Sequence, residues 1–223
     1  MLRFEPREIF IDKKKIIRFL GYNQDSKPYN KILKIIDMEI ENARSLLDPK
    51  GIYKIFDADR FEEKLFKDGE KVALAVVTIG EDLEKEVQGL FEEAEGTRGL
   101  ILDAVGSAAT EETANLLNRE IIKEAEKEGL KTTRRFSPGY GRWSQEGQDL
   151  IFKNIEEVER ELGVVLNPSM VMMPVKSTSF AVKMGKSYME EINQGQCRDC
   201  HLKEDCLRNR TTPLCSVLPI KNI

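Results

Sequence analysis

Residues 134–143 are the part of the sequence best suited to holding a small ligand. Pro138 fixes φ, and Gly139 permits a left-handed backbone or a close approach of the main chain to a ligand. Arg135 would offer a guanidinium to a carboxylate, and Tyr140 would offer a phenol to a reaction centre. An ordinary tight turn between a strand and a helix is the alternative, because Pro-Gly pairs commonly mark turns.

A single carboxylate interrupts the small, apolar face of a predicted helix over residues 99–128. Glu111 is in line with Leu100, Ala104 and Ala108, at spacings of eleven, seven and three residues. A charge on such a face needs a cationic partner. A glutamate at the edge of the helix that turns to water is the alternative.

The third group of reactive side chains is Cys197, Cys200, Cys206 and Cys215, with the only histidine, His201, among them. Thiolates at these short spacings are suited to zinc or to an iron–sulfur cluster. In a reducing compartment, four cysteines this close together favour metal binding over disulfides. Four reduced thiols on a flexible end of the chain are the alternative.

Three segments resemble the activation domain of cobalamin-dependent methionine synthase, which binds S-adenosylmethionine and presents its methyl group to reduced cobalamin. Residues 135–140 (RFSPGY) match its R-x-x-P-G-Y motif. Residues 103–117 (DAVGSAATEETANLL) look like its small-residue helix with a ligand-binding glutamate. Residues 166–180 (LNPSMVMMPVKSTSF) look like its late S-x-x-M-x-P-x-x-S-x-S stretch. The segments occur in the same order within residues 99–184, and earlier residues are only loosely similar.

The resemblance implies a role for each matching residue. Arg135 corresponds to an arginine that pairs with the methionyl carboxylate, and Ser137 and Gly139 to backbone contacts with the ligand. Tyr140 corresponds to a tyrosine that faces the cobalamin, and it is the residue we assign to catalysis. Glu111 corresponds to the helix carboxylate, for which the α-ammonium or sulfonium of the ligand would be the cation.

Two positions depart from the family's pattern. The large enzymes have an early aspartate in an I-D-W context that contacts the ligand, and here only Asp12, within Ile11-Asp12-Lys13, is a candidate. They also carry a Tyr-Tyr pair in a late loop, where this chain has the single Tyr188, which we assign to the ligand site. The activation domain does not account for the cysteine-rich end.

The spacing of apolar residues predicts the elements that would position these groups. Helices are expected at 28–48, from about 81 to 95, at 99–128 and at 145–162; strands are expected at 52–56, at 72–79, at 131–136 and on either side of Pro174 within 169–184. The expected helices and strands do not alternate regularly, and no G-x-G-x-x-G motif follows residue 79. Both observations argue against a doubly wound fold. We expect an α+β fold: a single mixed domain with a mainly antiparallel sheet and flanking helices over residues 1–195, followed by a short Cys-rich C-terminal tail over residues 196–223.

Composition excludes several classes of function. The chain has 223 residues and a formal net charge of -4, with acidic and basic residues interleaved, and no basic stripe that would bind nucleic acid. It has neither the ~20 apolar residues of a membrane span nor the pattern of a signal peptide at its start, so we expect a cytoplasmic protein with no membrane partner. The hydroxyls of residues 177–179 have no histidine nearby in the sequence, which argues against a serine hydrolase.

The resemblance implies that the protein binds S-adenosylmethionine and supports reductive remethylation of cobalamin. No D-x-H-x-x-G cobalamin motif is present, so the cobalamin is expected on a separate methionine synthase or corrinoid protein, with a flavodoxin- or ferredoxin-like electron donor. One alternative is an iron–sulfur electron-transfer or corrinoid-activating protein that uses the Cys tail. The other is a non-catalytic adaptor with a structural zinc.

Overall fold

The computed structural model describes residues 2–6, 8–22, 26–141 and 143–186. Five strands form one sheet in the order β1-β2-β3-β7-β4, and each neighbouring pair is antiparallel. The strands are β1 (Leu2–Phe4), β2 (Lys50–Asp57), β3 (Lys71–Thr78), β7 (Ser177–Gly185) and β4 (Lys131–Thr132). The predicted α+β fold with a mainly antiparallel sheet and flanking helices is confirmed.

The centre of the sheet is built from its most apolar strand. β3 pairs with β2 on one side and with β7 on the other, from Lys71↔Met184 to Thr78↔Ser177. Its residues 72–78 are all buried, as expected for a strand covered on both faces. The sheet therefore has a separate hydrophobic core on each of its two faces.

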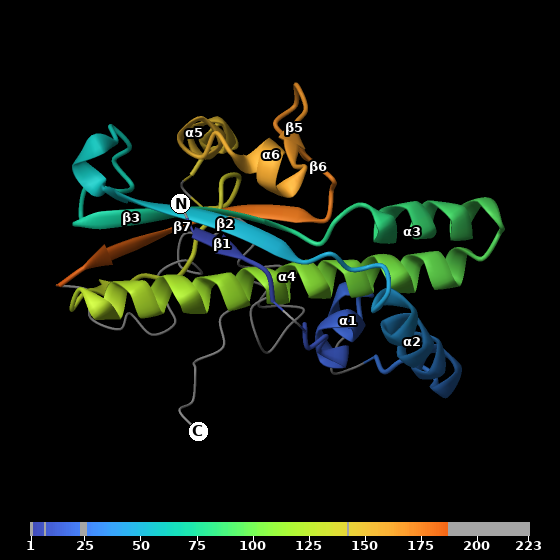
Figure 1. The fold of residues 1–223 in the computed structure, drawn as a ribbon. Coiled ribbons are helices and arrows are strands. Elements are labelled where there is room, and N and C mark those ends of the chain that lie inside the picture. The colour runs from blue at the N-terminus through green and yellow to red at the C-terminus, as the bar shows by residue number, and fades with distance from the viewer. Residues whose placement is uncertain (1, 7, 23–25, 142, 187–223) are drawn as a thin grey trace.

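The first face of the sheet is covered by a single long helix, α4 (Gly96–Lys127), which lies below the strands in Figure 1 and contacts β2, β3, β7 and β4. Its C-terminal half packs Ala114, Leu117 and Ile121 against β7 residues that include Phe180 and Val182. A Cβ built on Gly51 of β2 would be 3.0 Å from the Leu117 side chain, so the glycine allows the helix to approach the sheet closely. α4 thus fixes the positions of its side chains relative to β7 and β4.

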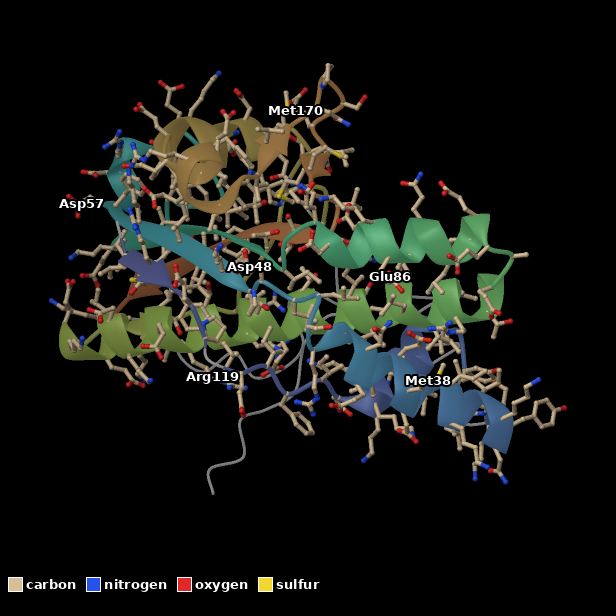
Figure 2. The ribbon with its side chains drawn as sticks, turned by 45° about the vertical axis from the view of Figure 1, so that its right-hand side comes forward. Met38, Asp48, Asp57, Glu86, Arg119 and Met170 are labelled. Carbon is tan, nitrogen blue, oxygen red and sulfur yellow. The ribbon has the colours of Figure 1, made fainter. Side chains whose placement is uncertain are left out.

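The N-terminal half of α4 extends past the sheet and packs on α1 (Lys13–Phe19), α2 (Asn30–Ala43) and α3 (Asp82–Glu92) (Figure 1). Glu39 of α2 is fully buried there and accepts a 2.6 Å hydrogen bond from Arg98 Nε and a 3.1 Å bond from Asn42 Nδ2. This ion pair raises the pKa of Arg98 and attaches α2 to the start of α4. Met38 marks this helical end of the molecule in Figure 2.

The second face of the sheet is covered by short elements. They are η1 (Ala58–Arg60), α5 (Gly147–Asn154), α6 (Val158–Leu162) and a two-stranded ribbon of β5 (Val165–Leu166) and β6 (Met172–Met173). Five aromatic rings meet under them, with Trp143 5.6 Å from Phe66 and 5.4 Å from Phe136 between ring centres. Met170, at the turn of the ribbon, and Arg119, on α4, lie on opposite sides of the sheet (Figure 2).

Some elements differ from the prediction. Residues 145–162 form two helices, α5 and α6, instead of one, because the chain leaves the helix at the fully buried Ile155. β1 and α1 were not predicted. The boundary after residue 195 and the tail over residues 196–223 lie outside the described residues and stay predictions. No described helix is both long and apolar enough to cross a membrane.

Candidate functional site

Glu111 lies at the midpoint of α4, where the helix passes from one core to the other. Ala108 and Ala109 belong to the core shared with α1, α2 and α3, and Ala114 belongs to the core under the sheet. The Glu111 side chain is 26% exposed, so the carboxylate lies at the rim of both cores instead of in open solvent. Leu100, which the spacing placed on the same buried face, is 58% exposed.

Arg135 reaches the same place from the edge of the sheet. After β4 the chain stays beside β7, with Thr133 N donating to Lys183 O and Phe136 N donating to Ala181 O. Successive side chains of an extended segment point to opposite faces. Phe136 therefore joins the aromatic cluster on the second face, whereas Arg135 points to the face that α4 covers.

Arg135 and Glu111 are direct partners. Arg135 Nη2 donates to Glu111 Oε1 and also donates to Asn115 Oδ1 at 3.1 Å. The guanidinium carbon lies 5.5 Å from the centre of the Phe180 ring, within cation–π range. The Arg135 side chain is only 12% exposed. The structure thus gives Glu111 the cationic partner that its position required, and that partner belongs to the protein.

The sequence predicts that Glu111 binds the ammonium or sulfonium of the ligand and that Arg135 binds its carboxylate. The structure brings them together, as a common site requires, but it pairs them with each other. The alternative of a glutamate turned to water is wrong, because a part-buried arginine holds its carboxylate. Their roles toward a ligand are not tested by the geometry and stay predictions.

The Pro-Gly segment next to Arg135 is a tight turn. Tyr140 N donates to Ser137 O at 3.2 Å, with Pro138 and Gly139 between them and Gly139 at φ +83°. Proline followed by a glycine with positive φ is the pattern of a type II turn. Gly139 N donates to Trp143 O at 2.9 Å, so the Ser137 carbonyl and the Gly139 N–H are already used inside the loop.

Tyr140 extends from this turn and is 67% exposed. The part-buried Phe136 and the buried Trp143 hold the loop on either side of it, through contacts with each other and with Phe66. The structure therefore places an exposed phenol on a well-anchored loop, beside the segment that carries Arg135.

Lys176 is a charged residue at this face of α4 that the sequence analysis did not single out. Its Nζ donates to Asp103 Oδ1 at 2.8 Å and to Ser107 Oγ at 2.9 Å, and its side chain is 11% exposed. Lys176 lies within the late S-x-x-M-x-P-x-x-S-x-S stretch, which was the one signal that could have directed attention to it.

Several predicted site residues are not part of this arrangement. Asp12 is the N-cap of α1, where its carboxylate accepts a 2.8 Å bond from Lys14 N. Tyr188 and the four ligand candidates Cys197, Cys200, Cys206 and Cys215 lie outside the described residues. Within the described part of the chain no group of histidine, cysteine or acidic residues could hold a metal ion.

The hydroxyls of Ser177 and Ser179 have structural partners. The Ser177 hydroxyl donates to Thr78 Oγ1 at 2.9 Å, and the Ser179 hydroxyl donates to Gln148 Oε1 at 2.6 Å, with all four residues buried. These contacts give both serine hydroxyls a role in packing β7 against its neighbours.

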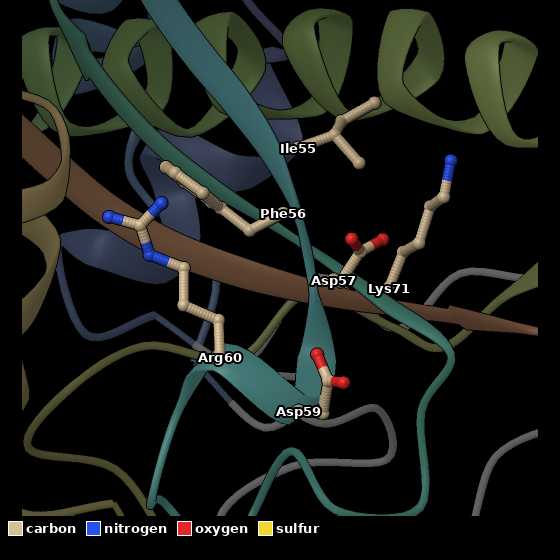
Figure 3. Close-up of a pocket in the computed structure, with 6 residues that line it drawn as sticks. All are labelled: Ile55, Phe56, Asp57, Asp59, Arg60 and Lys71. Carbon is tan, nitrogen blue, oxygen red and sulfur yellow. The ribbon is translucent and has the colours of Figure 1, made fainter.

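A surface pocket lies elsewhere, where β2 ends and β3 begins (Figure 3). It is lined by Ile55, Phe56, Asp57, Asp59, Arg60 and Lys71, and it contains none of the predicted site residues. Its cations are already engaged, because the Arg60 guanidinium lies 5.0 Å from the Phe56 ring centre and Lys71 pairs with Glu128. We therefore do not assign ligand chemistry to this pocket.

Comparison with known proteins supports the fold. No family model matches the chain, and no curated protein matches it. Among solved structures, the chain is similar to the crystal structure of the MetH reactivation domain bound to AdoHcy, with a TM-score of 0.62 and 15% sequence identity. The match covers 93% of this chain and 85% of the other. The likeness shows that the two proteins share a fold.

Proposed function

We propose that this chain binds S-adenosylmethionine through Glu111, Arg135 and the turn over residues 137–140, and supports reductive remethylation of a corrinoid carried by a separate protein. One observation carries the proposal: an acidic and a basic side chain from distant segments meet beside an anchored Pro-Gly turn. They do so in a fold similar to that of a reactivation domain solved with AdoHcy.

The charges of Glu111 and Arg135 are complementary to the amino acid end of such a ligand. That end carries an ammonium and a carboxylate on the same carbon atom, and a carboxylate and a guanidinium are their ordinary partners. Binding would exchange one internal ion pair for two intermolecular ones. Neither protein charge is then left unpaired, so the exchange avoids the large cost of burying an isolated charge.

In the proposed reaction, the electron donor reduces the partner's corrinoid by one electron, and the reduced corrinoid takes the methyl group of S-adenosylmethionine, which leaves as S-adenosylhomocysteine. The part of this chain is to hold the sulfonium methyl in line and to exclude water. No proton transfer is required, which fits a site without a histidine among the residues assigned to it. Tyr140, exposed at the end of the turn, would face the corrinoid protein.

Titration calorimetry with S-adenosylmethionine tests the proposal. Wild-type protein should bind, and Arg135→Ala should weaken binding by ~1.5–3 kcal/mol, the scale of a charge-assisted hydrogen bond. Arg119→Ala is the matched control, because Arg119 is 53% exposed and pairs with Glu112 instead of Glu111. A folded wild-type protein that gives no binding heat at millimolar ligand would refute the proposal.

The partner is tested separately. A cobalamin-bearing methionine synthase or corrinoid protein, together with a flavodoxin or ferredoxin as electron donor, should recover its methylated form faster when this chain is present. Equal recovery with and without the chain would contradict remethylation, while leaving S-adenosylmethionine binding intact.

We also propose that Cys197, Cys200, Cys206 and Cys215 bind a metal, as zinc or as an iron–sulfur cluster. Protein purified without oxygen should contain about one site per chain, and Cys197→Ser combined with Cys200→Ser should remove it. Iron with a brown colour and no ligand binding would favour the electron-transfer alternative. Zinc with neither ligand nor corrinoid binding would favour the adaptor, and metal-free protein with four titrating thiols would refute the metal site.

A further inference from the structure

Four polar residues of α4 form one line along the helix. Asp103, Ser107, Glu111 and Asn115 are spaced four apart, so each is one turn from the next on the same side, and we call them the polar stripe. Two cations from other segments bridge successive pairs of the stripe. Lys176 bonds to Asp103 and Ser107, and Arg135 bonds to Glu111 and Asn115.

Lys176 is held in place along its whole length. Its backbone N–H donates to Glu84 Oε1 at 2.5 Å, and its carbonyl accepts from Ile79 N at 3.2 Å and from Thr110 Oγ1 at 3.3 Å. A Cβ built on Gly106 would be 3.2 Å from Lys176 Cε, so the glycine gives the aliphatic stem room against α4. The position of the ammonium is therefore set before any ligand arrives.

The ammonium of Lys176 has bonding capacity left. It carries three N–H donors, and within the described part of the chain Asp103 and Ser107 accept two of them. Glu111 is one helical turn beyond Ser107, a separation of roughly 6 Å. Lys176 and Arg135 thus lie on opposite sides of Glu111 along the stripe.

We propose that Lys176 binds the carboxylate of the ligand's amino acid end, together with Arg135. This inference rests on the proposed binding of S-adenosylmethionine. A ligand ammonium on Glu111 places the carboxylate of the same carbon between the two cations. The Arg135 guanidinium already donates a hydrogen bond to Asn115 and stacks on Phe180. The Lys176 ammonium has a third N–H that can donate to the ligand's carboxylate.

The test compares S-adenosylmethionine with decarboxylated S-adenosylmethionine, which differs from it by the loss of that carboxylate. Lys176→Met keeps much of the stem and removes the charge. This variant should lower the affinity for S-adenosylmethionine about tenfold and leave the affinity for the decarboxylated compound unchanged. Lys85→Met is the control, because Lys85 is 62% exposed on α3 and pairs with Glu81, and both affinities should stay at the wild-type level.

A second variant guards against a folding defect. Asp103→Asn leaves Lys176 in place and removes its competing anion, so S-adenosylmethionine should bind about threefold more tightly while the decarboxylated compound does not. Equal losses for both compounds in Lys176→Met, or no loss for either, would overturn the assignment of Lys176. Wild-type protein that binds neither compound would overturn the proposed function itself.

Discussion

Glu111 and Arg135, 24 residues apart in the sequence, form an ion pair that joins the middle of α4 to the edge of the sheet. Arg135 also bonds Asn115, one turn further along the helix. The Arg135 side chain is 12% exposed and the Glu111 side chain is 26% exposed. The pair therefore contributes to the packing of α4 as well as to the proposed site.

The stability of the free protein should report this pair. Arg135→Ala leaves a part-buried carboxylate without its main partner, which should lower the free energy of unfolding by ~1–3 kcal/mol. Arg135→Ala combined with Glu111→Gln should recover part of that loss, giving a coupling energy of roughly 0.5–3 kcal/mol by urea unfolding. The exposed Lys85–Glu81 pair is the control and should couple by less than about 1 kcal/mol. Additive losses at Arg135 and Glu111 would mean that the pair does not form in solution.

Tyr140→Phe should separate binding from reaction. The ring is 67% exposed, so removing its hydroxyl should change the free energy of unfolding by less than ~0.5 kcal/mol. S-adenosylmethionine should still bind, because Arg135 and Glu111 are unaltered. Remethylation of the partner's corrinoid should change, and an unaltered rate would remove Tyr140 from the reacting end of the site.

The fold could be predicted where the residue pattern is strong over many residues. The continuous apolar run of β3 and the small-residue periodicity of α4 are such patterns, and both elements are observed close to their expected bounds. β1 has three residues and is held by pairing with β2, from Leu2↔Tyr53 to Phe4↔Gly51. Such a strand owes its existence to contacts with distant residues, which local patterns do not contain.

The candidate site was predictable only in part, for the same reason. The tight turn at Pro138 and Gly139 is encoded locally and was anticipated as an alternative. Arg135 meets Glu111 because the extended segment after β4 stays paired with β7 as far as Phe136. The spacing of residues in the sequence does not predict how far this pairing continues. Lys176 was missed because its significance comes from Asp103 and Ser107, more than sixty residues away.

Tyr53 should make the protein less stable at high pH. Burial on β2, together with the nearby carboxylates of Glu124 and Glu120 on α4, raises the pKa of its phenol from 10.0 to about 12. Between these two pH values the unfolded chain loses the proton and the folded chain keeps it, so the free energy of unfolding falls as pH rises. Tyr53→Phe should be less sensitive over this range. Equal pH dependence in both proteins, measured by chemical unfolding, would contradict a buried phenol.

Gly139→Ala tests whether the turn shapes the ligand site. At φ +83° a side chain costs about 1–2 kcal/mol, and the new Cβ would lie 2.4 Å from Gln145 Oε1. That oxygen is the end of an exposed, flexible side chain, so it can move, at the loss of one exposed hydrogen bond to Met170 O. Gly129→Ala is a matched control, with φ +69° and nothing within 4 Å of its Cβ. Both variants should lose a similar amount of stability. Calorimetry should show weaker binding of S-adenosylmethionine only for Gly139→Ala. Equal affinity in the two variants would show that the turn takes no part in binding.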